Sequence, residues 1–194
     1  MSPTSYQTAL PRVLMGGIME EKFDCQRGNQ TEIFPMPSLL FVCLGNICRS
    51  PMAEGIAAGI IARRRDADQW RVDSAGTGDW HVGNLADHRT LAVLKRHKLP
   101  ASHRARQVRV EDFTVFNHVF AMDRKNLAHL EALRPDGATA RVGLLGDHDP
   151  LGVAEVPDPY YDGPEEFTAV HAQLERTLLA FFAEHPESGG PTER

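Results

Sequence analysis

A cysteine and an arginine of complementary chemistry stand close together in residues 42–51, which read VCLGNICRSP. Cys43 precedes Arg49 by a short loop, and Ser50-Pro51 follows directly. A guanidinium offers a planar fork of donors that matches two phosphate oxygens, and a thiolate is a strong nucleophile. A chain that brings these two groups together can transfer a phosphoryl group to sulfur.

The residues between Cys43 and Arg49 fit a loop that surrounds an anion. Gly45 and Asn46 can adopt the positive φ angles that such a loop needs. A helix that begins here directs backbone N–H groups and its positive dipole end at the anion. These surroundings favour the thiolate of Cys43, to which Ser50 can donate a hydrogen bond. The predicted phosphate-binding residues are Leu44, Gly45, Asn46, Ile47, Cys48 and Ser50, besides Arg49.

The cysteines also have plainer interpretations. Cys43 alone would be read as a buried apolar cysteine. Cys48 can close a disulfide with Cys43 that protects it reversibly from overoxidation, or it can simply pack in the core. A zinc site is disfavoured because no second ligand pair lies nearby, and a nucleotide-binding P-loop is excluded because the chain has no Gly-Lys dipeptide. We expect neither a metal nor a cofactor.

The loop lies between a predicted strand and a predicted helix. Residues 39–42 form a short apolar run that favours a buried strand. Ser50-Pro51, with Glu54 expected in the first turn, marks the start of a helix. The run Arg63-Arg64-Arg65 suits the negative end of that helix and is expected to be solvated.

The same alternation continues along the chain. It predicts strands near 70–74, 119–122 and 141–145, helices near 85–97, 124–134 and 165–184, and a glycine-rich loop over 75–84. Such alternation implies an α/β fold, doubly wound, with a four-stranded parallel sheet and helices on both faces. Ligands bind at the carboxyl ends of strands in these folds, where the loop after the first strand lies.

The predicted domain spans residues 37–185 and leaves a segment on either side. Residues 1–36 lack sustained periodicity, so we expect a disordered N-terminal extension, or translation that begins at Met19 or Met36. Residues 186–194 are expected to form a flexible tail.

Composition narrows the class of protein. No run approaches the roughly 18 apolar residues of a transmembrane helix, and no signal peptide is recognisable, so we expect a cytoplasmic protein without a membrane partner. Three cysteines, an odd number, argue against a secreted disulfide framework. The net charge of −5 argues against nucleic-acid binding. We expect a monomer.

Two motifs in this order resemble the low-molecular-weight protein tyrosine phosphatases. They are the loop of residues 43–51 and Asp158-Pro159-Tyr160-Tyr161, and the resemblance extends over residues 39–182. It implies hydrolysis of phosphotyrosine in proteins through a phosphocysteine at Cys43. Asp158 matches the family's general acid, which protonates the leaving group and then acts as base on water. Without the cysteine loop, the Asp-Pro dipeptide would be read as a turn.

The resemblance implies supporting roles for further residues. Ser74 matches a serine that hydrogen-bonds the loop asparagine, here Asn46. His103 matches a histidine below the loop, near the glutamate equivalent to Glu54, where it would be protonated and orient its neighbours; a purely structural histidine is the alternative. Asp123 matches a network position with a structural role.

Trp80 and Tyr160 match family positions that flank an aryl phosphate. Flat walls above a deep floor favour phosphotyrosine, whose longer arm reaches a thiolate that phosphoserine does not reach. Simple loop packing is the alternative for Trp80. The implied partner is a tyrosine-phosphorylated protein, and bacterial relatives suggest a tyrosine kinase. The resemblance also allows phosphorylation of Tyr160 or Tyr161.

Three alternative functions are weighed against this one. Protein-arginine phosphatases tend to carry threonine where Ile47 stands and lack the tyrosine pair, so they are disfavoured. Arsenate reductases of the same fold need further cysteines downstream, and none follows Cys48. A module that merely binds phosphate is disfavoured because both a nucleophile and an acid are present.

Overall fold

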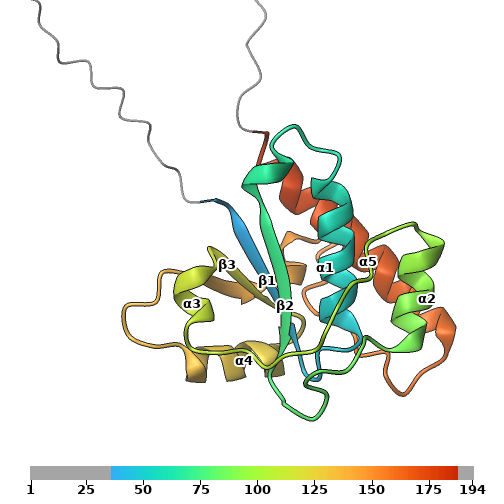
Figure 1. Ribbon diagram of the computed structural model, residues 1–194, viewed down its shortest axis with the longest axis horizontal. Helices are drawn as coiled ribbons and strands as arrows, with labels where there is room; N and C mark the ends of the chain where they lie inside the picture. Colours follow the sequence, from blue (N-terminus) through green and yellow to red (C-terminus); the bar gives the residue numbers. More distant parts are fainter. Residues whose placement is uncertain (1–35, 188–194) are drawn as a thin grey trace, which may run out of the picture. The chain divides into compact units, whose positions relative to one another are not determined.

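The computed structural model describes residues 36–187, in which four parallel strands form one sheet (Figure 1). The strands are β1 (Ser38–Cys43), β2 (Arg71–Gly76), β3 (His118–Ala121) and β4 (Arg141–Leu144), in the spatial order β2-β1-β3-β4. The predicted doubly wound sheet is confirmed. Apart from Met36, Pro186 and Glu187, the predicted extension and tail lie outside the described residues.

Helices cover both faces of this sheet, as predicted. They are α1 (Arg49–Ile61), α2 (His88–Arg96), α3 (Asp112–Val115), α4 (Arg124–Leu133) and α5 (Pro164–Glu184), with 3-10 turns η1 (Ala67–Gln69) and η2 (Leu145–His148). In Figure 1, α1, α2 and α5 lie on one side of the strands, and α3 and α4 on the other. None of the helices in the described part is long and apolar enough to cross a bilayer.

The element boundaries differ from the predicted ones at a few points. Because α1 begins at Arg49, Glu54 lies beyond its first turn and not within it. Helix α2 begins three residues later than predicted, because the side chain of Asp87 accepts the N–H of Arg89 and caps it there. The short α3, η1 and η2 were not predicted.

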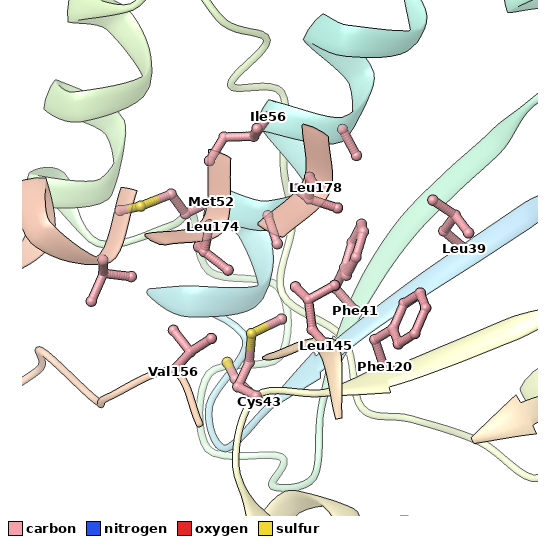
Figure 2. Close-up of a cluster of buried hydrophobic side chains, with 14 of the residues drawn as sticks. Leu39, Phe41, Cys43, Met52, Ile56, Phe120, Leu145, Val156, Leu174 and Leu178 are labelled. Carbon is pink, nitrogen blue, oxygen red and sulfur yellow. The ribbon is translucent and has the colours of Figure 1, made fainter. Parts of the chain in front are cut away.

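Strand β1 is buried on both faces and divides the core into two clusters. Leu39, Phe41 and Cys43 join the cluster beneath α1 and α5, whereas Leu40 and Val42 join the cluster beneath α3 and α4. Figure 2 shows the first cluster, with Cys43 at its edge. Packing on both faces of β1 holds the backbone from which the predicted phosphate-binding loop, residues 44–48 (the phosphate loop), departs.

The crossovers bring several loops together at the carboxyl-terminal ends of the strands. Strand β1 lies between β2 and β3, and the connections from β1 and β3 leave on opposite faces, which is the switch point where such folds bind ligands. Cys43 pairs in register with Gly76, and the N–H of Met122 donates to the Val42 carbonyl. The ends of three strands therefore surround the start of the phosphate loop.

A histidine at the opposite end of the strands, His118, leads us to expect that acid lowers the stability of the protein. His118 begins β3, and its ring packs on Phe120 and Phe181 at centroid distances of 5.5 Å. Burial, with help from His185, Arg141 and His148, lowers the pKa of His118 from 6.5 to about 4. Only the neutral ring suits this site, so its stabilising contribution is present above pH 6.5 and is lost as the pH falls towards 4.

We therefore expect the free energy of unfolding to fall by about 1 to 2 kcal/mol over this pH range on account of His118, after allowing for solvent screening. Urea denaturation of the wild type, of His118→Gln and of His88→Gln checks it. His88 has an 88% exposed side chain and serves as the control. Only His118→Gln should flatten the pH dependence; parallel curves for all three proteins would contradict the prediction.

Candidate active site

The phosphate loop, residues 44–48, connects β1 to α1. Asn46 is buried and has a φ of 56°, in the left-handed region, as predicted. The same prediction is wrong for Gly45, which is not among the residues with positive φ. Gly45 leaves space for a neighbour instead, because a Cβ there would lie 3.0 Å from the ring of His81, which would have to shift.

The side chain of Asn46 holds the loop from inside. The N–H of Arg106 donates to Asn46 Oδ1 at 2.8 Å, which fixes the orientation of the amide. Nδ2 then donates to the hydroxyl oxygens of Ser50 and Ser74, each at 2.9 Å. Ser74 in turn donates to a carboxylate oxygen of Glu54 at 2.6 Å.

The nucleophile candidate, Cys43, is 3% exposed and faces this network. Its Sγ accepts the backbone N–H of Asn46 at 3.3 Å and lies 3.0 Å from Ser50 Oγ. Because Ser50 Oγ already accepts from Asn46, its own proton is available to Cys43 Sγ or to the Ala75 carbonyl at 3.3 Å. Two donors therefore surround the sulfur.

The predicted supporting residues meet below the loop. His103 Nε2 donates to the Asn46 carbonyl at 2.8 Å, and Nδ1 lies 3.3 Å from Glu54. Ser74, His103 and Glu54 thus contact one another and Asn46, although they come from β2, a connecting loop and α1. The contacts implied by the resemblance are present.

The side chain of Arg49 is 3% exposed and bridges two carboxylates. It forms ion pairs with Asp123 at 2.5 Å and with Asp158 at 2.7 Å, and Nη1 also donates to the Val156 carbonyl at 3.1 Å. Burial alone would lower the pKa of Arg49, but Cys43, Asp158 and Asp123 outweigh it and raise the pKa above its ordinary value. Arg49 is therefore a fixed positive charge.

One donor of that guanidinium is unused. Arg49 Nε is buried and has no hydrogen-bond partner among residues 36–187. A buried donor without a partner is costly, and an anion in the adjoining cavity would satisfy it. Asp123, besides accepting from Arg49, caps α4 by accepting the N–H of Asn126 at 2.7 Å, so the structural role expected for it is met.

Asp158 reaches the site from a segment far along the chain. We call residues 157–163 the acid segment. The side chain of Asp158 is 41% exposed. One oxygen of its carboxylate pairs with Arg49, and the other accepts the N–H of Tyr160 at 3.3 Å. The N–H of Val156 donates to the Met122 carbonyl, which ties the segment to the end of β3. The structure thus brings Cys43, Arg49 and Asp158 together.

These residues surround a cavity of about 310 Å³. It is lined by the loop residues Cys43, Leu44, Gly45, Ile47, Cys48 and Arg49, and by Trp80, His81, Asp158, Tyr160 and Tyr161. Trp80 is 69% exposed and lies over Gly78, where a Cβ would collide with its ring. It is therefore both a packed loop residue and a wall of the cavity. His81 and Tyr161 were not predicted to line it.

The second loop cysteine has a different environment from the first. Cys48 is 4% exposed, and burial, with Asp87 and Cys43, raises the pKa of its thiol far above the usual range. Both loop cysteines are free thiols. The protective disulfide stays a prediction. Within the described part of the chain, no group of three or more histidine, cysteine or acidic side chains could hold a metal ion.

Comparisons with known proteins give the same pattern. Residues 38–188 match the family model described as low molecular weight phosphotyrosine protein phosphatase. A human protein of that name is 42% identical over 146 residues, which cover 74% of this chain and 92% of the human protein. The crystal structure of a protein tyrosine phosphatase from Entamoeba histolytica has a TM-score of 0.73 at 35% identity and covers 77% of this chain and 96% of its own. A Drosophila arginine phosphatase has a TM-score of 0.72 at 35% identity and covers 78% and 99%.

Proposed function

This chain belongs to the low molecular weight phosphotyrosine protein phosphatase family, and from that premise we propose that it hydrolyses phosphotyrosine in proteins through a phosphocysteine. The observation that carries the proposal is the convergence of Cys43, Arg49 and Asp158 on one cavity. The three groups supply a nucleophile, a phosphate ligand and a proton donor, which together suffice for phosphoryl transfer to sulfur.

In the first step the phosphate dianion binds to the loop amides and to the guanidinium of Arg49, where it takes the free donor Nε and competes with Asp158 for Nη2. Cys43 Sγ attacks phosphorus, and the bond from phosphorus to the phenolic oxygen breaks. Asp158 enters this step as the protonated acid, in the state that the second step restores, and gives its proton to that oxygen, so tyrosine leaves as the neutral phenol. The ion pair between Arg49 and Asp158 keeps both groups at the cavity before the phosphate arrives.

In the second step a water molecule attacks the phosphocysteine. The Asp158 carboxylate takes a proton from the water, the bond from sulfur to phosphorus breaks, and inorganic phosphate is released. Cys43 leaves as a thiolate, and the donors from Ser50 and Asn46 stabilise that negative charge.

Substrate choice follows from the depth and walls of the cavity. The nucleophile is buried at the base, and exposed aromatic side chains, Trp80 and Tyr160, stand at the walls. An aryl phosphate spans this depth and packs its ring between the aromatic groups. The shorter arm of phosphoserine does not reach Cys43 while its backbone stays outside.

Phosphoarginine is the second candidate substrate, because the Drosophila arginine phosphatase is as similar in fold as the tyrosine phosphatase. Ile47 and Tyr160 favour phosphotyrosine over it. Arsenate reduction has less support, because the 194 residues contain no cysteine after Cys48 to relay a disulfide.

A rate comparison on matched peptides tests the proposal. We expect kcat/KM for a phosphotyrosine peptide to exceed the values for the phosphoserine and phosphoarginine peptides by about 10²-fold or more. Arsenate reduction with thioredoxin is measured in parallel and should be absent. Faster turnover of the phosphoarginine peptide would replace phosphotyrosine by the second candidate.

A further inference from the structure

The N-terminal end of α2 lies between the phosphate loop and the acid segment and contacts both. On one side, the N–H of Asp87 donates to the Ile47 carbonyl at 2.8 Å. On the other, Arg89 Nη1 donates to the Asp162 carbonyl at 2.8 Å and Nη2 to the Tyr160 carbonyl at 3.0 Å. The backbone of Asp87 and the side chain of Arg89 thus connect the phosphate loop to the acid segment.

The guanidinium of Arg89 is held in one orientation. Nε and Nη2 donate to the two carboxylate oxygens of Asp87, each at 2.9 Å, and the group lies 4.3 Å above the ring of Phe167 from α5. The side chains of Asp87 and Arg89 are 9% and 19% exposed. Burial raises the pKa of Asp87, but hydrogen bonds from Arg89 outweigh it, so the pKa is lowered and the pair stays charged.

The acid itself has no comparable anchor. The side chain of Asp158 is 41% exposed, and its carboxylate forms an ion pair with Arg49. The phosphate of a substrate must engage the same arginine. Once phosphate competes for the guanidinium of Arg49, the hold of that residue on Asp158 weakens. The acid segment then needs a support that does not take part in phosphate binding, and the carbonyls two and four residues after Asp158 are bonded to Arg89.

We propose that Arg89, oriented by Asp87, is a positioning residue that holds the acid segment over the phosphate loop during proton transfer. This inference rests on the proposed phosphatase function and adds a residue pair to it. Arg89 touches no reacting atom. Its effect passes through Asp158, so it should appear only when the leaving group needs a proton.

The test compares two aryl phosphates that differ in this need. Phenyl phosphate leaves as a basic phenolate that requires a proton, whereas 2,4-dinitrophenyl phosphate releases a stable anion without one. Arg89→Gln should lower kcat/KM for phenyl phosphate by about 10- to 100-fold and for the dinitrophenyl ester by less than about threefold. The ratio kcat/KM is used because it reports the steps up to departure of the phenol. Arg89→Lys keeps the charge but not the fork, and an intermediate loss is expected.

A double-mutant cycle identifies the residue through which Arg89 acts. In an Asp158→Asn background, Arg89→Gln should lower kcat/KM for phenyl phosphate by less than about threefold, because the group that Arg89 positions has been removed. Full additivity of the two losses, or equal losses on both esters, would overturn the proposal. Arg89→Lys supplies the same comparisons if the glutamine variant does not fold.

The chain offers a matched control at the other end of α1. Arg64 forms a similar fork with Asp66 at 2.8 and 3.0 Å, donates to the His185 carbonyl at 3.1 Å and lies 5.2 Å from the ring centroid of Trp70. Arg64→Gln removes the same kinds of contact away from the site. It should change the melting temperature without changing the ratio of the two rates.

A wrong assignment of the phosphatase mechanism would give a different pattern of rates from a wrong assignment of Arg89. If Asp158→Asn alone has no effect that depends on the leaving group, the assignment of the acid is wrong. If Asp158→Asn shows that effect and Arg89→Gln does not, the positioning role alone is wrong.

Discussion

Replacement of Cys43 by serine is expected to reduce the hydrolysis of a phosphotyrosine peptide by at least about 10⁴-fold. A serine hydroxyl is not ionised near neutral pH, and neither group that contacts Cys43 Sγ, the hydroxyl of Ser50 and the N–H of Asn46, is a base that could remove its proton. The oxygen can still accept from the N–H of Asn46 and contact Ser50, so the loop should keep its shape. Steady-state kinetics with the peptide measures the loss.

A loss of activity alone would not separate chemistry from folding. The Cys43→Ser protein should therefore still bind inorganic phosphate, detected as a rise in melting temperature, because Arg49 and the loop amides remain. Acid quenching of the wild type during turnover should yield a phosphate adduct on the peptide that contains Cys43. A fully active Cys43→Ser protein would show that the nucleophile lies elsewhere.

The phosphate loop could be predicted because its parts are contiguous in the sequence. A buried apolar run, a short loop and a helix with Pro51 in its first turn fix the position of Cys43 and Arg49 relative to each other without any knowledge of the rest of the fold. The order of strands and helices was equally accessible, because each element has its own local pattern. Only the short α3, η1 and η2 were missed, since a single turn carries no periodicity.

Asp158 could not have been placed by such patterns. An Asp-Pro dipeptide indicates a turn, and only resemblance to a family assigned it to a cavity formed around residues 43–49. Its position depends on contacts between segments that are far apart in the sequence, such as the hydrogen bond from the N–H of Val156 to the Met122 carbonyl at the end of β3. Long-range packing of this kind is not encoded in the neighbouring residues.

Arg89 shows a second limit of sequence reasoning. Its partners in the acid segment are the main-chain carbonyls of Tyr160 and Asp162, and every residue has a carbonyl. Nothing in the identity of those residues signals the contact. Asp87, the cap of α2, is of a residue type that often begins helices, but the predicted helix started two residues before it.

Gly45 was singled out for a reason that the fold does not use. Glycine suits both a positive φ and a close approach, and the sequence cannot distinguish these needs. The neighbouring Asn46 takes the left-handed conformation, while Gly45 leaves room for the ring of His81. His81 also lines the cavity, which no pattern around Trp80 indicated.

The second large effect is expected at Asp158. Asp158→Asn should lower kcat/KM for phenyl phosphate by about 10² to 10⁴-fold, the usual contribution of a general acid, and should affect 2,4-dinitrophenyl phosphate far less. An amide is similar in shape but has no acidic proton to give. Asp162→Asn is the matched control, because Asp162 is an exposed acid of the same segment whose contact with Arg89 uses only the main chain.

The same substitution should strengthen the binding of inorganic phosphate. Asp158 pairs with Arg49 at 2.7 Å, so its carboxylate both competes with phosphate for the guanidinium and repels the dianion. Asp158→Asn removes both effects while Asp123 still holds Arg49, and the inhibition constant of phosphate should fall by about three- to tenfold. Slower turnover with tighter phosphate binding can be explained only if one carboxylate is both the acid and the partner of Arg49. A rise in both the rate and the inhibition constant, or a response shared by Asp162→Asn, would contradict that dual role.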